Sequence, residues 1–413
     1  MRRALAASLL GLALVGCKKQ SPPEAAPVVE SSDEPSLPSR CSPLGEAFVV
    51  GEREAVPEGE SEHLLPFSAE VGEAVVHDSG FAASATFFRK KARISGLVLL
   101  GADGRGARFV ELGEARGDMG PPHLASRGSS LFVAVVEPGK DDRVIRLGKL
   151  EGTKVAFGGS VNEKRDESLA LDLAVGARTG LLAWDEEGPE GGGIVLVSFD
   201  PATAAIQGRP RTISNPALPA DTPKLVARDG GFVLAYVVRR NQGEKPSSED
   251  RFETEEVGFR SIEAVFLDEK GERQGEALAI TPPDGHVAAF DMTRLPDGAL
   301  AIVWREDDGP SGSGGGRVLG ALVRGTTVSE PIVLADEKVG SGTPGIAGRW
   351  ISISDSSDVT RVGKLSPSFT LEGSLEADQG IGQGEVLAAE GDVLLVARPR
   401  GKAILLAAVR CGG

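Results

Sequence analysis

Seven glycines recur along the chain about 50 residues apart, and a short apolar segment follows each of them. These apolar segments, for example 131–136 and 300–304, are nearly continuous, as expected for strands covered on both faces. A smaller, alanine-rich segment precedes most of the glycines, and further apolar segments follow the polar loops. The pattern predicts a repeated unit of four strands with a tight turn after the first. The turn glycines are Gly80, Gly128, Gly180, Gly231, Gly298, Gly348 and Gly391.

A four-stranded repeat of this length is typical of a β-propeller, in which each repeat is one sheet, or blade, packed between two neighbours. We therefore predict an all-β fold, a seven-bladed β-propeller over residues 41–413. The last repeat has no fourth strand before Gly413, whereas the apolar segment 45–50 has no repeat of its own. We expect this N-terminal strand to complete the seventh blade and close the ring. Six or eight blades, or two β-sandwich domains, are the alternatives.

The cysteines agree with such a closure. Cys41 precedes the N-terminal strand and Cys411 follows the last strand. Disulfides persist outside the cytoplasm, so we expect a Cys41–Cys411 bond that joins the two ends of the ring. Two free thiols are the alternative.

The N-terminus resembles the signal peptide of bacterial lipoproteins. Arg2 and Arg3 precede the apolar segment 4–16, which is too short to span a bilayer. The segment ends in Leu-Val-Gly-Cys at 14–17, which is similar to a lipobox. The resemblance implies removal of residues 1–16, lipidation (palmitate or a related chain) of Cys17 and stable membrane anchoring. A cleaved signal with an incidental cysteine is the alternative.

The segment after Cys17 predicts where the protein resides. Lys18 occupies the position at which many such proteins carry the aspartate linked with inner-membrane retention, so we expect the outer membrane of the bacterial cell envelope. Residues 17–40 form the lipidated cysteine and a segment rich in proline, serine and acidic residues, for which we expect a disordered tether.

The overall charge limits the partners. The chain has 60 acidic and 45 basic residues, a net charge of −15. Such a surface disfavours nucleic acid and anionic lipid as partners.

Motifs for catalysis or for cofactor binding are absent from the sequence. It contains no Gly-x-Ser-x-Gly, no His-Glu-x-x-His and no EF-hand loop. The four histidines include no pair spaced for a metal. We expect no cofactor and no metal site, and we expect Tyr236, Trp184 and Trp304 to be packing residues.

The loops between the second and third strands are long and charged in several repeats, and equivalent loops of successive blades emerge on one face. They predict a rim that either binds a partner or cation, or consists of solvated connections. The candidate residues of this rim are Asp185, Glu186, Glu187, Arg239, Arg240, Arg305, Glu306 and Asp307.

These observations favour an anchored, extracytoplasmic lipoprotein whose propeller is a non-catalytic binding or scaffold module for an envelope protein or polymer. The alternative is a hydrolase acting on glycans or another polymer, which needs carboxylates that converge on the central channel. Asp172 and Asp291, near inner strands, are the candidates. A third possibility is a calcium-stabilised propeller.

Overall fold

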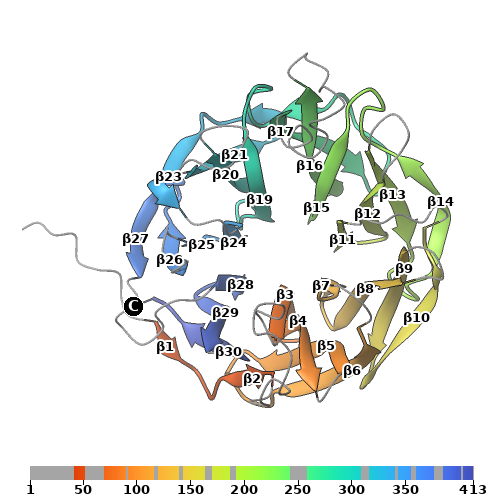
Figure 1. The fold of residues 1–413 in the computed structure, drawn as a ribbon, viewed down its shortest axis with the longest axis vertical. Coiled ribbons are helices and arrows are strands. Elements are labelled where there is room, and N and C mark those ends of the chain that lie inside the picture. Colours follow the sequence, from red (N-terminus) through yellow and green to blue (C-terminus); the bar gives the residue numbers. More distant parts are fainter. Residues whose placement is uncertain are drawn as a thin grey trace, which may run out of the picture. The chain divides into compact units, whose positions relative to one another are not determined.

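Seven antiparallel sheets are arranged as the blades of a ring, as Figure 1 shows. The computed structural model describes residues 41–51, 69–89, 92–115, 120–138, 143–162, 170–186, 192–241, 258–307, 316–339, 343–354, 360–375, 385–400 and 403–412. They lie in one compact unit, Pro38–Gly413. None of these described residues belongs to a helix that could cross a membrane.

The first four blades each contain four strands, which run in chain order from the centre of the ring outward. Blade 1 comprises β3 (Ala69–His77), β4 (Gly80–Arg89), β5 (Ala92–Gly101) and β6 (Arg108–Glu114). Blade 2 comprises β7 (His123–Arg127), β8 (Ser130–Pro138), β9 (Arg143–Glu151) and β10 (Lys154–Ser160). Blade 3 comprises β11 (Leu171–Val175), β12 (Gly180–Glu186), β13 (Gly193–Phe199) and β14 (Ile206–Thr212). Blade 4 comprises β15 (Ala220–Arg228), β16 (Gly231–Asn241), β17 (Gly258–Asp268) and the short β18 (Leu278–Ala279).

The remaining blades vary this plan. Blade 5 has a divided outer edge and comprises β19 (Val287–Arg294), β20 (Leu300–Asp307), β21 (Gly316–Arg324), β22 (Thr327–Val328) and β23 (Ile332–Val339). Blade 6 has short strands and comprises β24 (Gly345–Ala347), β25 (Trp350–Ser354), β26 (Thr360–Leu365) and β27 (Leu371–Leu375). Blade 7 combines both ends of the chain and comprises β28 (Glu385–Glu390), β29 (Val393–Arg400), β30 (Ala403–Arg410), β1 (Ser42–Pro43) and β2 (Phe48–Val50).

The closure of the ring is as predicted. Both β1 and β2 pair antiparallel with β30, with Ser42 opposite Arg410 and Phe48 opposite Leu406. The predicted disulfide joins Cys41 and Cys411, which are separated by 370 residues. Strands from the two ends of the chain therefore share one sheet, which leaves no open gap between the first and last blades.

The hydrophobic core is a series of layers between blades. Each buried cluster takes residues from two neighbouring blades, and together the clusters cover all seven blade interfaces. Along β8, Phe132 packs toward blade 3 while Leu131 and Val133 pack toward blade 1. This two-sided burial explains why the second strands are nearly continuous in apolar residues. Trp184, Trp304 and Tyr236 are all buried in these layers, as predicted.

The first two strands of each blade are joined by a hairpin turn, and we call the end of the blade that carries this turn its lower end. The repeated glycine is required by the backbone of this turn. Gly231 has a φ of +154°, and a Cβ at this position would collide with the carbonyl oxygen of Leu267. At Gly180 a Cβ would overlap the ring of Phe199. These positions therefore accept only a residue without a side chain.

Candidate functional site: the central channel

The channel is lined by all seven inner strands, β3, β7, β11, β15, β19, β24 and β28, and has a volume of about 550 Å³. Four acidic residues and one lysine line it, which is unexpected for strands that otherwise carry small apolar residues. The charged lining residues are Glu73, Asp172, Lys224, Asp291 and Glu385.

Backbone irregularities place several of these side chains. Three of the seven inner strands change register beside a charged channel residue, at 71–74, 221–224 and 386–388, and a fourth changes register at 287–289, two residues before Asp291. A β-bulge redirects the side chains beside it. In β15, Thr222 has a φ of +52° and Lys224 follows the bulge.

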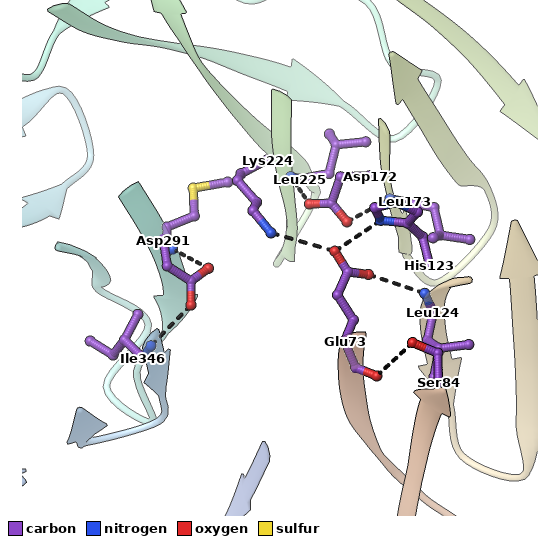
Figure 2. A network of polar contacts seen from close by, with 11 residues as sticks. Glu73, Ser84, His123, Leu124, Asp172, Leu173, Lys224, Leu225, Asp291 and Ile346 are labelled. Carbon is purple, nitrogen blue, oxygen red and sulfur yellow. Dashed lines mark hydrogen bonds and ion pairs between the residues drawn. The ribbon is translucent and has the colours of Figure 1, made fainter. Parts of the chain in front are cut away.

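Three of the acids connect neighbouring blades, as Figure 2 shows. The Leu124 amide, in blade 2, donates to Glu73 Oε2 at 3.1 Å. Between blades 3 and 4, the Leu225 amide donates to Asp172 Oδ2 at 2.6 Å. The Ile346 amide donates to Asp291 Oδ2 at 2.9 Å. Each carboxylate thus binds the inner strand of the following blade and holds two blades in register.

The other oxygens of these acids are also occupied. Asp172 Oδ1 accepts the Leu173 amide at 2.7 Å, and Asp291 Oδ1 accepts the Met292 amide at 2.9 Å. Glu73 Oε1 lies 3.1 Å from His123 Nδ1 and 3.4 Å from Lys224 Nζ. Because an ionised carboxylate only accepts, His123 Nδ1 carries the proton of this contact.

The pKa values of the channel residues are shifted in different directions. Burial alone would raise the pKa of Glu73, but His123 and Lys224 beside it lower that pKa to about 2. Burial, together with the negative charge of Glu73, raises the pKa of Asp172 to about 7. Burial also raises the pKa of Asp291. Burial disfavours the charged form of Lys224, yet the carboxylates of Glu73, Asp172 and Asp291 raise its pKa overall.

Glu385 differs from the other acids. It lines the channel and is accessible to solvent there, although protein atoms lie around it. Within the described part of the chain, no hydrogen bond or ion pair holds its carboxyl group. Burial and the nearby Asp291 raise its pKa to about 7. Glu385 is therefore the channel acid best placed to contact a ligand directly.

The rim residues predicted from the sequence lie at the opposite ends of the second strands from the turn glycines, and Glu187 falls outside the described residues. Asp185 accepts the Ala170 amide at 2.7 Å, and burial raises its pKa to about 7. Trp184 Nε1 donates to Glu186 at 3.4 Å. Arg239 pairs with Asp221 of the adjacent strand.

The remaining rim residues also contact charged neighbours. Arg240 lies 2.8 Å from Glu263, Arg305 lies 2.9 Å from Asp307, and Glu306 lies 3.3 Å from Arg317. Most rim charges are thus satisfied within their own blades, and a binding role for the rim stays a prediction. Cys17 lies outside the described residues.

The structure brings Asp172 and Asp291 to the channel together with residues that the sequence analysis did not single out as site residues, namely Glu73, His123, Lys224 and Glu385. The sequence carries one pattern that could have indicated them. Asp172, Asp291, Glu73, Lys224 and Glu385 each stand about seven residues before a turn glycine, the same place in each repeat. No group of three or more histidine, cysteine or acidic side chains among the described residues is arranged to hold a metal ion.

Comparisons with known proteins show the fold alone. No protein-family model matches the sequence, and a comparison with curated proteins finds no match. A polysaccharide lyase, Uly1, is 12% identical with a TM-score of 0.54 and covers 88% of this chain and 97% of its own. The β-propeller domain of the Trilobed protease from Pyrococcus furiosus is 11% identical, with a TM-score of 0.47, and covers 84% and 95%. An α-L-arabinanase from Penicillium chrysogenum is 12% identical, with a TM-score of 0.45, and covers 70% and 93%. The chain is a seven-bladed β-propeller.

Proposed function

We propose that this protein is an envelope-anchored, non-catalytic binding propeller that takes a polar ligand in the central channel. One observation carries the proposal: both carboxyl oxygens of Asp172, and both of Asp291, are occupied by backbone amides. A glycosidase needs two carboxyl groups that are free to act on either side of the scissile bond. Here these acids instead hold adjacent blades together, which gives the channel a rigid wall.

The chemistry of the lining indicates the kind of ligand. Four acids face one lysine, and Lys224 is already paired with Glu73. Excess carboxylate favours ligands that donate hydrogen bonds, such as hydroxylated molecules and amines. Glu385 is the acid that such a ligand would contact, because its carboxyl group has no partner among the described residues.

Anchoring through Cys17 is part of the same proposal. The lipobox-like segment at 14–17 supports it, and so does the tether expected at 17–40. Metabolic labelling with a palmitate analogue tests it: we expect the wild type to be labelled and a Cys17→Ser variant to be unlabelled. Labelling of both proteins would exclude Cys17 as the lipidated residue. Fractionation of the envelope would then locate the protein in the inner or outer membrane.

The channel is tested by measuring binding and turnover on the same panel of oligosaccharides and polyamines. We expect the wild type to bind at least one compound without converting it, Glu385→Gln to lose that binding, and Glu330→Gln to retain it. Glu330 is an exposed glutamate outside the channel lining and provides a matched control. Equal binding by all three proteins would refute the channel as the site.

A glycan- or polymer-acting hydrolase is the second candidate, and Glu385 is again the observation that favours it. A carboxyl group with a pKa of about 7 is suited to donate a proton near neutral pH. Turnover by the wild type that is lost in Glu385→Gln, with unchanged melting temperature, would establish this candidate. Absence of turnover across the panel would count against it.

A further inference from the structure

A second pocket lies at the lower end of the ring, among the hairpin turns of blades 3 and 4. Its volume is about 350 Å³, and backbone segments 175–179 and 227–232 form much of its wall. Four arginines line it, contributed by four consecutive blades: Arg127, Arg178, Arg228 and Arg294. Only two acids, Asp229 and Glu269, belong to the lining. The pocket is thus locally basic in a chain whose net charge is −15.

The arrangement of the arginines follows from the repeat. Arg127, Arg228 and Arg294 are the last residues of the inner strands β7, β15 and β19, and Arg178 is in the turn after β11. Equivalent strand ends meet at one face of the ring, so the guanidinium groups gather there. Lys224 and Arg228 lie on the same strand, and four residues of strand span about 13 Å. The pocket is therefore separate from the acidic cluster in the channel.

Two of the arginines form ion pairs in which one member is largely exposed to solvent. Arg294 lies 2.6 Å from Asp229, whose side chain is 92% exposed. Arg178 lies 3.4 Å from Glu269 and is itself 82% exposed. Exposed ion pairs of this kind contribute little and exchange readily. A stronger anion in the pocket would therefore compete with both acids at small cost.

The other two arginines have no acidic partner among the described residues. Arg127 donates to the Ala177 carbonyl in the neighbouring blade, and Arg228 donates to the Gln274 amide oxygen at 3.1 Å. The guanidinium of Arg228 lies 5.1 Å from the centre of the Phe266 ring, and its Nε is buried without a hydrogen-bond partner. These contacts hold both side chains in place and leave their positive charges uncompensated.

We term this cavity the arginine pocket. We propose that it binds the oxyanion group of a ligand, which is a phosphate, a sulfate or a carboxylate. Guanidinium groups recognise all three through paired, charge-assisted hydrogen bonds. Side chains already fixed by neighbouring blades lose little freedom on binding. Val175 and Ala227 line both this pocket and the channel, but none of the four arginines belongs to the channel lining, and the site goes beyond the function proposed above.

Calorimetric titration of the full-length protein with inorganic phosphate, sulfate and citrate at constant ionic strength tests this site. We expect saturable binding of at least one anion, and the anion that binds most tightly identifies the chemical group. Arg127→Gln and Arg228→Gln should each weaken binding about tenfold, the loss of one charge-assisted contact. Arg209→Gln is the matched control, because Arg209 is exposed on β14 and outside the pocket.

A variant with increased affinity separates a binding role from a folding defect. Asp229→Asn removes the acid that competes for Arg294, so it should tighten anion binding severalfold, a gain that misfolding would not produce. The proposal is overturned if none of the three anions binds saturably. It is also overturned if Arg127→Gln, Arg228→Gln and Arg209→Gln bind the anion equally well, or if Asp229→Asn leaves the affinity unchanged.

Discussion

Removal of the Cys41–Cys411 disulfide should destabilise the ring measurably, and the expected size follows from the loop that the bond closes. The bond spans 370 residues. In the chain-entropy description, a cross-link over such a loop removes about 20 cal/mol/K from the unfolded chain, or about 6 kcal/mol at 25 °C. Unfolding entropy is about 2 cal/mol/K per residue, so a domain of this size should lose about 8 °C in melting temperature.

Calorimetric melting of the wild type, Cys41→Ser, Cys411→Ser and the double variant measures the effect. All three variants should melt at similar temperatures, because either substitution removes the same bond. Reductant should bring the wild type to the same level and leave the double variant unchanged, which serves as the control. A double variant that melts within about 2 °C of the oxidised wild type would refute the reasoning. That result would mean that the cross-link does not restrict the unfolded chain.

Three further substitutions test the channel and the turns. Asp291→Ala leaves two backbone amides without their acceptor and should cost about 3 kcal/mol in urea unfolding; a loss below about 1 kcal/mol would contradict an inter-blade role. The pKa of Glu385 is raised to about 7, so the wild type loses stability as pH rises from about 4.5 to 7. Glu385→Gln should therefore melt higher than the wild type at pH 8 but not at pH 4, and Glu330→Gln should show no such difference. Gly231→Ala should destabilise far more than Gly230→Ala, because only the former Cβ meets the backbone of β17; equal melting temperatures would exclude the collision.

The blades could be predicted from the sequence because their signals are local. A turn glycine and the apolar strand after it lie within ten residues or so, and packing between two neighbours requires the apolar residues on both faces of that strand. The closing strand was predictable for a related reason, since 45–50 had no repeat of its own and Cys41 and Cys411 stand at the two ends.

The channel cluster could be predicted only in part. Asp172 and Asp291 were singled out by their place near inner strands. Glu73 on β3 and Lys224 on β15 contact each other although 151 residues separate them in the sequence, so no local pattern indicates the pair. Bulges shift the register next to both residues, and a bulge has no clear sequence signature here. The ion pairs of the rim were likewise hidden, because partners such as Asp221 and Glu263 lie on different strands.

The sharing of blade 7 between the two chain ends sets an order of events during synthesis. β1 and β2 are made early, whereas their partner β30 is made last. At about 5–20 residues per second, roughly 20 to 70 seconds separate them. Until β30 is available the ring cannot close, and any arc of blades formed before then exposes the apolar sides of its two end blades. Closure of the ring therefore depends on both ends of the chain being present together.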